Sequence, residues 1–110
     1  MVKSRIETYL GFCVKARKIV FGAEEAENQK RGVFLLLFDE ELGKSSQKSI
    51  AKAMEKFACP TYTLKAGALG ELLHRPAVKA AAIKDKNLAA AIIDAASGEP
   101  QFKLYSGGTD

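Results

Sequence analysis

The chain has 110 residues, of which 47% are hydrophobic and 27% charged, and its formal net charge is +4. This length and composition are typical of a single soluble globular domain with a core of its own. No apolar run reaches the roughly 18–20 residues that span a bilayer, and the first residues lack the apolar stretch of a signal peptide. We therefore expect a cytoplasmic, monomeric protein with no membrane contact.

The positive charge is concentrated in the first 18 residues. They hold five bases against the single acid Glu7, whereas the rest of the chain has 12 bases and 12 acids. The five bases are Lys3, Arg5, Lys15, Arg17 and Lys18. This asymmetry favours an anionic partner. A solvated basic helix face explains the charge equally well.

The first half of the chain begins with apolar residues at helical spacing, which predict a helix over residues 4–16. Residues 18–21 predict a short strand, which Gly22 interrupts. Residues 24 and 25 are acidic and suit the first turn of a second helix, which we expect to end by Gly32.

The continuous apolar run 33–38 predicts a strand covered on both faces, with Asp39 at its carboxyl end. After a loop at 40–44, we expect Ser45 or Ser46 to cap a third helix, because serine side chains accept hydrogen bonds from the first free N–H groups. Pro60 ends this helical region, and residues 61–64 predict another strand.

The second half begins with a short helix after Gly67, a turn at residues 75–76 and an apolar strand over 78–83. Asp85 is the expected cap of the last helix, which stops at residues 97–100. In the tail, apolar residues 102 and 104 alternate as in a short added strand, and we expect residues 106–110 to fray. Alternation of helices with buried strands predicts an α/β fold, a three-layer α/β/α sandwich around a small mixed four-stranded sheet. We assign residues 1–98 to one domain and 99–110 to a tail.

Motifs for catalysis are nearly absent. The chain has one histidine, His74, no tryptophan, and none of the common nucleophile, zinc-protease or nucleotide-loop motifs. The loop at His74 admits an active-site role, but a surface histidine is the favoured interpretation. Asp39 ends a buried strand, as the phosphoacceptor of a flavodoxin-like fold does, but that fold has a longer doubly wound sheet, whereas here the expected sheet is short and the chain starts with a helix. We expect no enzyme, no catalytic residues and no cofactor.

Metal binding is also not expected. The acids Glu24, Glu25 and Glu27 have no histidine or aspartate nearby in sequence, so a solvated helix face explains them better than a metal site. Cys13 and Cys59 are far apart and do not have the spacing of metal ligands. Two buried, reduced thiols are the favoured interpretation, and a disulfide or redox pair is the alternative.

Several short segments together resemble one known family. Residues 10–20 with the following Gly22 are similar to its opening helix and turn, residues 33–39 to a buried strand, and Cys59-Pro60 to the dipeptide before the next strand. Residues 69–70 and 80–83 match a later helix and the last strand. On these segments the chain resembles the ribosomal protein L-seven-Ae superfamily, which includes ribosomal protein L-thirty-e and small bacterial relatives.

The resemblance implies an α/β/α sandwich that binds structured RNA, typically kink-turns. In that family an Asn-Glu pair after the turn glycine reads sheared G·A pairs, and a nearby lysine holds phosphates. Gly22 and Glu25 match the turn glycine and the acidic reader. Glu24 stands where the asparagine is usual, and Asn28 where the lysine is usual. Two further departures are a shorter connection before residue 33 and His74-Arg75-Pro76 in place of a glycine-led loop.

We therefore predict a non-enzymatic RNA-binding protein, ribosomal or ribosome-associated, that recognises RNA of kink-turn type through a weakened site. The predicted RNA-binding residues are Lys15, Arg17, Lys18, Gly22, Ala23, Glu24, Glu25, Asn28, Arg31, His74 and Arg75. The alternative from another class is a protein-interaction module on the same fold. A small-molecule-binding enzyme subunit would require a deep pocket ringed by His74, Asp39 and Lys84.

Overall fold

The computed structural model describes residues 4–105. Its elements follow in chain order as α1 (Arg5–Lys15), β1 (Ile19–Phe21), α2 (Ala23–Glu27), β2 (Leu35–Asp39), α3 (Lys44–Phe57), β3 (Thr61–Leu64), α4 (Ala68–Leu73), β4 (Ala80–Ile83), α5 (Lys86–Ala96) and β5 (Phe102–Leu104). None of these helices is long and apolar enough to cross a membrane. The frayed end expected for residues 106–110 lies outside the described part of the chain.

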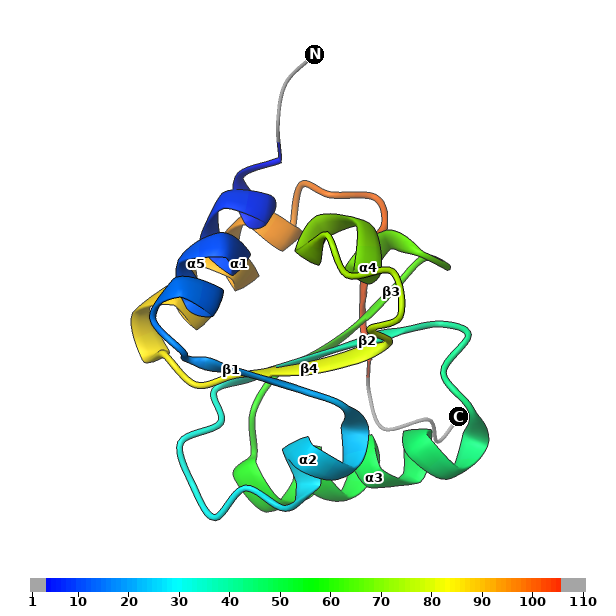
Figure 1. Ribbon diagram of the computed structural model, residues 1–110. Coiled ribbons are helices and arrows are strands. Elements are labelled where there is room, and N and C mark those ends of the chain that lie inside the picture. Colours follow the sequence, from blue (N-terminus) through cyan, green and yellow to red (C-terminus); the bar gives the residue numbers. More distant parts are fainter. Residues whose placement is uncertain (1–3, 106–110) are drawn as a thin grey trace.

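The strands form one mixed sheet in the order β1-β4-β2-β3-β5, in which only β2 and β3 are parallel. Helices α1, α4 and α5 cover one face and α2 and α3 the other (Figure 1). Strand β2 explains this layering, because all its residues are buried and alternate between two cores. Leu35 and Leu37 pack with the first group of helices, and Leu36 and Phe38 with the second. The expected three-layer α/β/α architecture is confirmed.

The sheet has five strands instead of the predicted four. The added strand is β5, which pairs antiparallel with β3 and places Tyr62 opposite Leu104. Phe102 is buried and its ring meets that of Tyr62 edge-on at 6.2 Å. The apolar alternation in the tail was therefore the signal of a sheet strand, since burial of Phe102 attaches this segment to the core.

Helix α2 ends at Glu27, well before the predicted boundary at Gly32. The ammonium group of Lys56 on α3 donates hydrogen bonds to the carbonyl oxygens of Glu27 and Gln29, at 3.0 and 2.6 Å. These bonds satisfy acceptors that the end of a helix leaves free. A long-range contact therefore stabilises the early end of α2, and Gly32 makes its turn, with φ +83°, in the connecting segment.

The predicted serine cap of α3 is wrong, whereas the predicted cap of α5 is confirmed. Helix α3 begins at Lys44 with Gly43 in the capping position, so Ser45 and Ser46 lie in its first turn. The Gln47 amide donates to the Leu42 carbonyl oxygen at 2.6 Å and fastens the chain before the helix. The Asp85 carboxylate accepts from the Leu88 N–H at 2.8 Å, as a capping aspartate does.

The other boundaries differ from the predictions by one or two residues. Helix α1 begins after Ser4, whose hydroxyl accepts a hydrogen bond from the Ile6 N–H at 3.2 Å. Strand β2 begins at Leu35, after Phe34, which is 37% exposed, and Asp39 is its last, fully buried residue. Strand β4 begins at Ala80.

Candidate nucleic-acid interface

The turn between β1 and α2 is built on a glycine conformation. Gly22 has φ +104° and ψ 144°, a region that residues with a Cβ atom rarely adopt. Its N–H donates to the Ala80 carbonyl oxygen at 2.9 Å, and its own carbonyl oxygen accepts from Ala26 at 3.1 Å. A Cβ atom at this position would also collide with the carboxylate of Glu25. The turn therefore requires glycine and is held to β4.

The loop between α4 and β4 lies beside this turn. His74 ends α4 in the left-handed conformation, with φ +57°. The Arg75 N–H then donates to the Gly70 carbonyl oxygen at 2.9 Å. The Arg75 guanidinium lies 4.8 Å from the centroid of the Phe21 ring, the residue before Gly22. This cation–π contact joins two of the predicted RNA-binding segments at one end of β1.

A first hollow of about 490 Å³ opens at the start of α2. It is lined by Gly22, Ala23, Glu24 and Glu25, and also by Lys79 and three serines of α3. Both glutamates are exposed, whereas Ala23 is only 6% exposed and packs in the core between α2 and α3. The hollow combines carboxylate acceptors with hydroxyl groups and one ammonium group.

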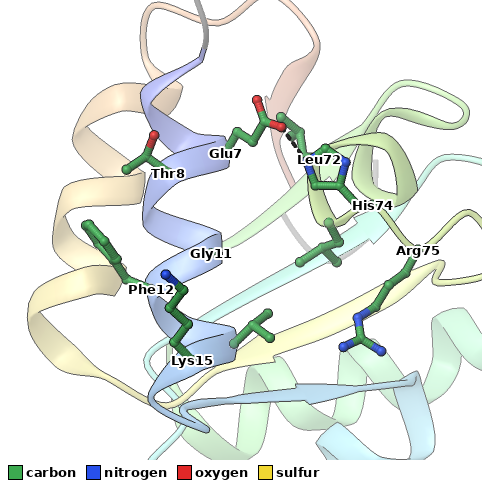
Figure 2. Close-up of a pocket in the computed structure, with 10 residues that line it drawn as sticks. Glu7, Thr8, Gly11, Phe12, Lys15, Leu72, His74 and Arg75 are labelled. Carbon is green, nitrogen blue, oxygen red and sulfur yellow. Dashed lines mark hydrogen bonds and ion pairs between the residues drawn. The ribbon is translucent and has the colours of Figure 1, made fainter.

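A second hollow of about 420 Å³ lies between α1 and the end of α4 (Figure 2). Lys15, His74 and Arg75 line it, together with Glu7 and Phe12. The His74 Nε2 lies 2.6 Å from the Glu7 carboxylate. Arg75 therefore belongs to this hollow and, through its contact with Phe21, also to the β1–α2 turn.

The remaining predicted residues are exposed, but they do not all lie together. Arg17 and Lys18 occupy the turn from α1 into β1, where Arg17 has φ +57°. Asn28 is the capping residue at the end of α2. Arg31 lines a different hollow, with Lys56 and Pro60. The structure thus brings together the residues around Gly22, Arg75 and Lys15, and assigns Arg31 to another part of the surface.

Two residues at this surface were not among those predicted. Phe21 supports Arg75, and Lys79 lines the hollow with Glu24 and Glu25. Pairing of β1 with β4, which sets Phe21 opposite Ala81, brings the start of β4 to the Gly22 turn. The sequence predicts β1 and β4 as strands, but it does not show how they pair. Lys79 could have been identified as a residue of this surface only from their antiparallel register.

The residues considered for catalysis have structural partners. The two carboxylate oxygens of Asp39 accept from the N–H groups of Glu41 and Gly67, each at 2.7 Å. The Lys84 ammonium group donates to the Gln29 side chain at 2.6 Å, and His74 pairs with Glu7. Within residues 4–105, Asp39, Lys84 and His74 thus take part in separate interactions with different partners.

The thiols are both free and buried in this fold. Burial, together with the nearby carboxylate of Asp85, raises the pKa of Cys13 to about 11. Burial also raises the pKa of Cys59. Thiols of this kind are poor nucleophiles near neutral pH. Within residues 4–105 there is no group of three or more His, Cys, Asp or Glu side chains placed to hold a metal ion.

Comparisons with known proteins support the fold alone. No protein-family model and no curated protein matches the chain. Among solved structures, it is similar to a protein with unknown function from Bacillus halodurans C, with a TM-score of 0.73 and 17% sequence identity. The match covers 84% of this chain and 97% of that chain. The architecture described here is thus shared with a solved structure.

Proposed function

We propose that this protein is a non-enzymatic RNA-binding protein that recognises structured RNA of kink-turn type, ribosomal or ribosome-associated, and that it acts in the cytoplasm as a monomer. One observation carries the proposal. The Arg75 guanidinium lies over the ring of Phe21, 4.8 Å from its centroid, directly before the glycine turn at Gly22. A cation and two exposed carboxylates are thereby presented on neighbouring segments of one surface.

The chemistry of this surface suits RNA that exposes base edges. Carboxylate oxygens of Glu24 and Glu25 are hydrogen-bond acceptors, which suit base amino and imino groups. Arg75 suits phosphate or a base face, because a guanidinium group both pairs and stacks. Structured RNA is recognised by its shape and its unpaired bases, with phosphate contacts that add affinity. The resemblance to the L-seven-Ae superfamily stays a prediction and supports the same assignment.

Binding to a kink-turn RNA tests the proposal. We expect gel-shift titrations to give tighter binding to a kink-turn duplex than to a hairpin of the same length and composition. The titrations are done at two salt concentrations, because phosphate contacts make affinity fall as salt rises. Equal affinity for the two RNAs would refute specific recognition.

The protein-interaction alternative makes a different prediction for the same surface. If Glu24 and Glu25 contact a protein, partners captured from a lysate persist after nuclease treatment. If they contact RNA, the partners are lost with the RNA. Capture by a variant with both glutamates changed to glutamine shows whether this surface is responsible.

A further inference from the structure

The segment between α2 and β2 forms a surface at the opposite end of the sheet from the Gly22 turn. The Phe34 N–H donates to the Ile83 carbonyl oxygen at 2.9 Å, and Ile83 pairs with Ile19 at the start of β1. The Gly22 turn follows the other end of this strand, after Phe21. In Figure 1 the segment, in cyan, accordingly lies near the beginning of β1, and the turn into α2 lies near its end. A ligand of this segment therefore need not contact the Gly22 turn.

A third hollow, of about 450 Å³, lies between this segment and the end of α3. Its apolar lining includes the exposed ring of Phe34, together with Phe57 and Pro60. Three cations also belong to the lining, and none of the described residues that line the hollow is an acid. The three cations are Lys30, Arg31 and Lys56. The hollow thus joins apolar surface to positive charge.

Only two of these cations are free to bind a partner. The Lys56 ammonium group is used within the chain, since it donates to the carbonyl oxygens of Glu27 and Gln29. Lys30 and Arg31 are exposed, and neither makes an ion pair with another residue in the range 4–105. Two free cations are fewer than the row that a nucleic-acid backbone contacts. Arginine beside exposed aromatic surface is, however, typical of a protein–protein interface.

The backbone of the segment adds hydrogen-bond donors next to the two free cations. Gly32 turns the chain with φ +83°. The N–H groups of Lys30, Arg31 and Gly32 donate to no acceptor among the described residues. Successive free N–H groups bind carboxylates or the carbonyl oxygens of an extended peptide. The cations and the free N–H groups therefore favour the same kind of ligand, one that carries anionic acceptor groups.

We propose that this surface docks an acidic segment of a partner protein. Carboxylates of that segment pair with Lys30 and Arg31, and an apolar side chain enters the hollow against Phe34. The proposal does not rest on the proposed RNA-binding function, because it uses neither the Gly22 turn nor the loop between α4 and β4. An RNA at the Gly22 turn and a protein at this surface can therefore be bound at the same time.

The test uses a fluorescent decapeptide of aspartate, glutamate and one central phenylalanine, in anisotropy titrations with the full chain. We expect Arg31→Glu to weaken binding about tenfold or more, because it places a carboxylate against the acidic peptide. Phe34→Ala should also weaken binding, because it removes apolar surface from the hollow. Lys103→Glu is the matched control, since it makes the same change of charge at an exposed position of β5, and it should leave the affinity nearly unchanged. Thermal unfolding checks that each variant is folded.

Amide chemical shifts of the parent locate the peptide without any substitution. We expect the peptide to shift the signals of residues 30–34 and to leave those of residues 22–25 unchanged. Absence of binding, shifts confined to other residues, or equal weakening by Lys103→Glu would overturn the proposal.

Titration with kink-turn RNA separates this proposal from the proposed function. If the RNA shifts residues 30–34 and displaces the peptide, the surface binds RNA and the assignment to a protein partner is overturned. If the RNA fails to bind while the peptide still shifts residues 30–34, the docking surface stands and the proposed function is refuted.

Discussion

Replacing Gly22 with alanine tests whether the β1–α2 turn depends on backbone conformation. The backbone at φ +104° is nearly restricted to glycine, and forcing alanine into it costs about 1–3 kcal/mol. For a domain of this size, that loss lowers the thermal midpoint by about 4–12 °C. We expect urea and thermal unfolding of Gly22→Ala to show a decrease in this range.

Two further variants identify the source of the loss. The added Cβ atom would also meet the Glu25 carboxylate, so Glu25→Ala in the same chain removes that collision. Because the backbone strain remains, we expect the double variant to stay destabilised relative to Glu25→Ala. Gly11→Ala is the opposite control. It adds the same methyl group in open space within a helix and should increase stability by about 0.5–1 kcal/mol. Full recovery in the double variant, or no loss in Gly22→Ala, would refute the reasoning.

Three other substitutions test the buried carboxylate, the interface and a buried thiol. Asp39→Asn can replace only one acceptor of the two N–H groups, at 2.7 Å each, so it should lower the free energy of unfolding by about 1–3 kcal/mol in urea titrations. The control Asp94→Asn, at an exposed position, should leave the free energy of unfolding unchanged. Arg75→Ala should weaken binding of kink-turn RNA and lower the slope of log affinity against log salt by about 1. If Lys103→Ala on β5 weakened RNA binding equally, that result would count against the proposed interface. Burial raises the pKa of Cys13 from 9.0 to about 11 in the folded chain, so the thiol ionises at lower pH when the chain is unfolded. The contribution of Cys13 to the free energy of unfolding is therefore complete below pH 9 and is lost as the pH rises through 11. Between pH 8 and pH 11, the free energy of unfolding measured in urea should therefore fall less for Cys13→Ala than for the parent. An equal fall in both proteins would refute a contribution from the buried thiol.

The sequence was sufficient for the architecture because the apolar patterns are local. The run before Asp39 predicted a strand buried on both faces, and all residues of β2 are indeed buried. The Asp85 cap was predictable for the same reason, since donor and acceptor lie three residues apart. The end of α2 was not predictable, because it is stabilised by Lys56 from a helix later in the chain.

The candidate surface was only partly predictable, because it depends on which strands are neighbours. Gly22 was identifiable as a breaker between a strand and a helix. That Arg75 lies on Phe21, however, follows from the pairing of β1 with β4 and from the close packing of Gly70 against the loop. A Cβ atom at Gly70 would lie only 3.0 Å from the Arg75 carbonyl oxygen. The contact between Arg75 and Phe21 joins residues more than fifty positions apart, and one sequence does not encode it in a local pattern.

Under the proposed function, the acids near the interface determine which kind of RNA contact is expected. Glu7 is paired with His74 at 2.6 Å, and Glu27 lies 4.0 Å from Lys52. The carboxylates of Glu24 and Glu25 stay exposed, in a hollow that also contains Lys79. Carboxylates repel phosphate but accept hydrogen bonds from bases, so this surface should depend more on base edges than on the RNA backbone. A kink-turn complex should then show a shallow salt dependence, with about two or three phosphate contacts. A steep slope would indicate many phosphate contacts and would refute the view that base edges dominate recognition at the Gly22 turn.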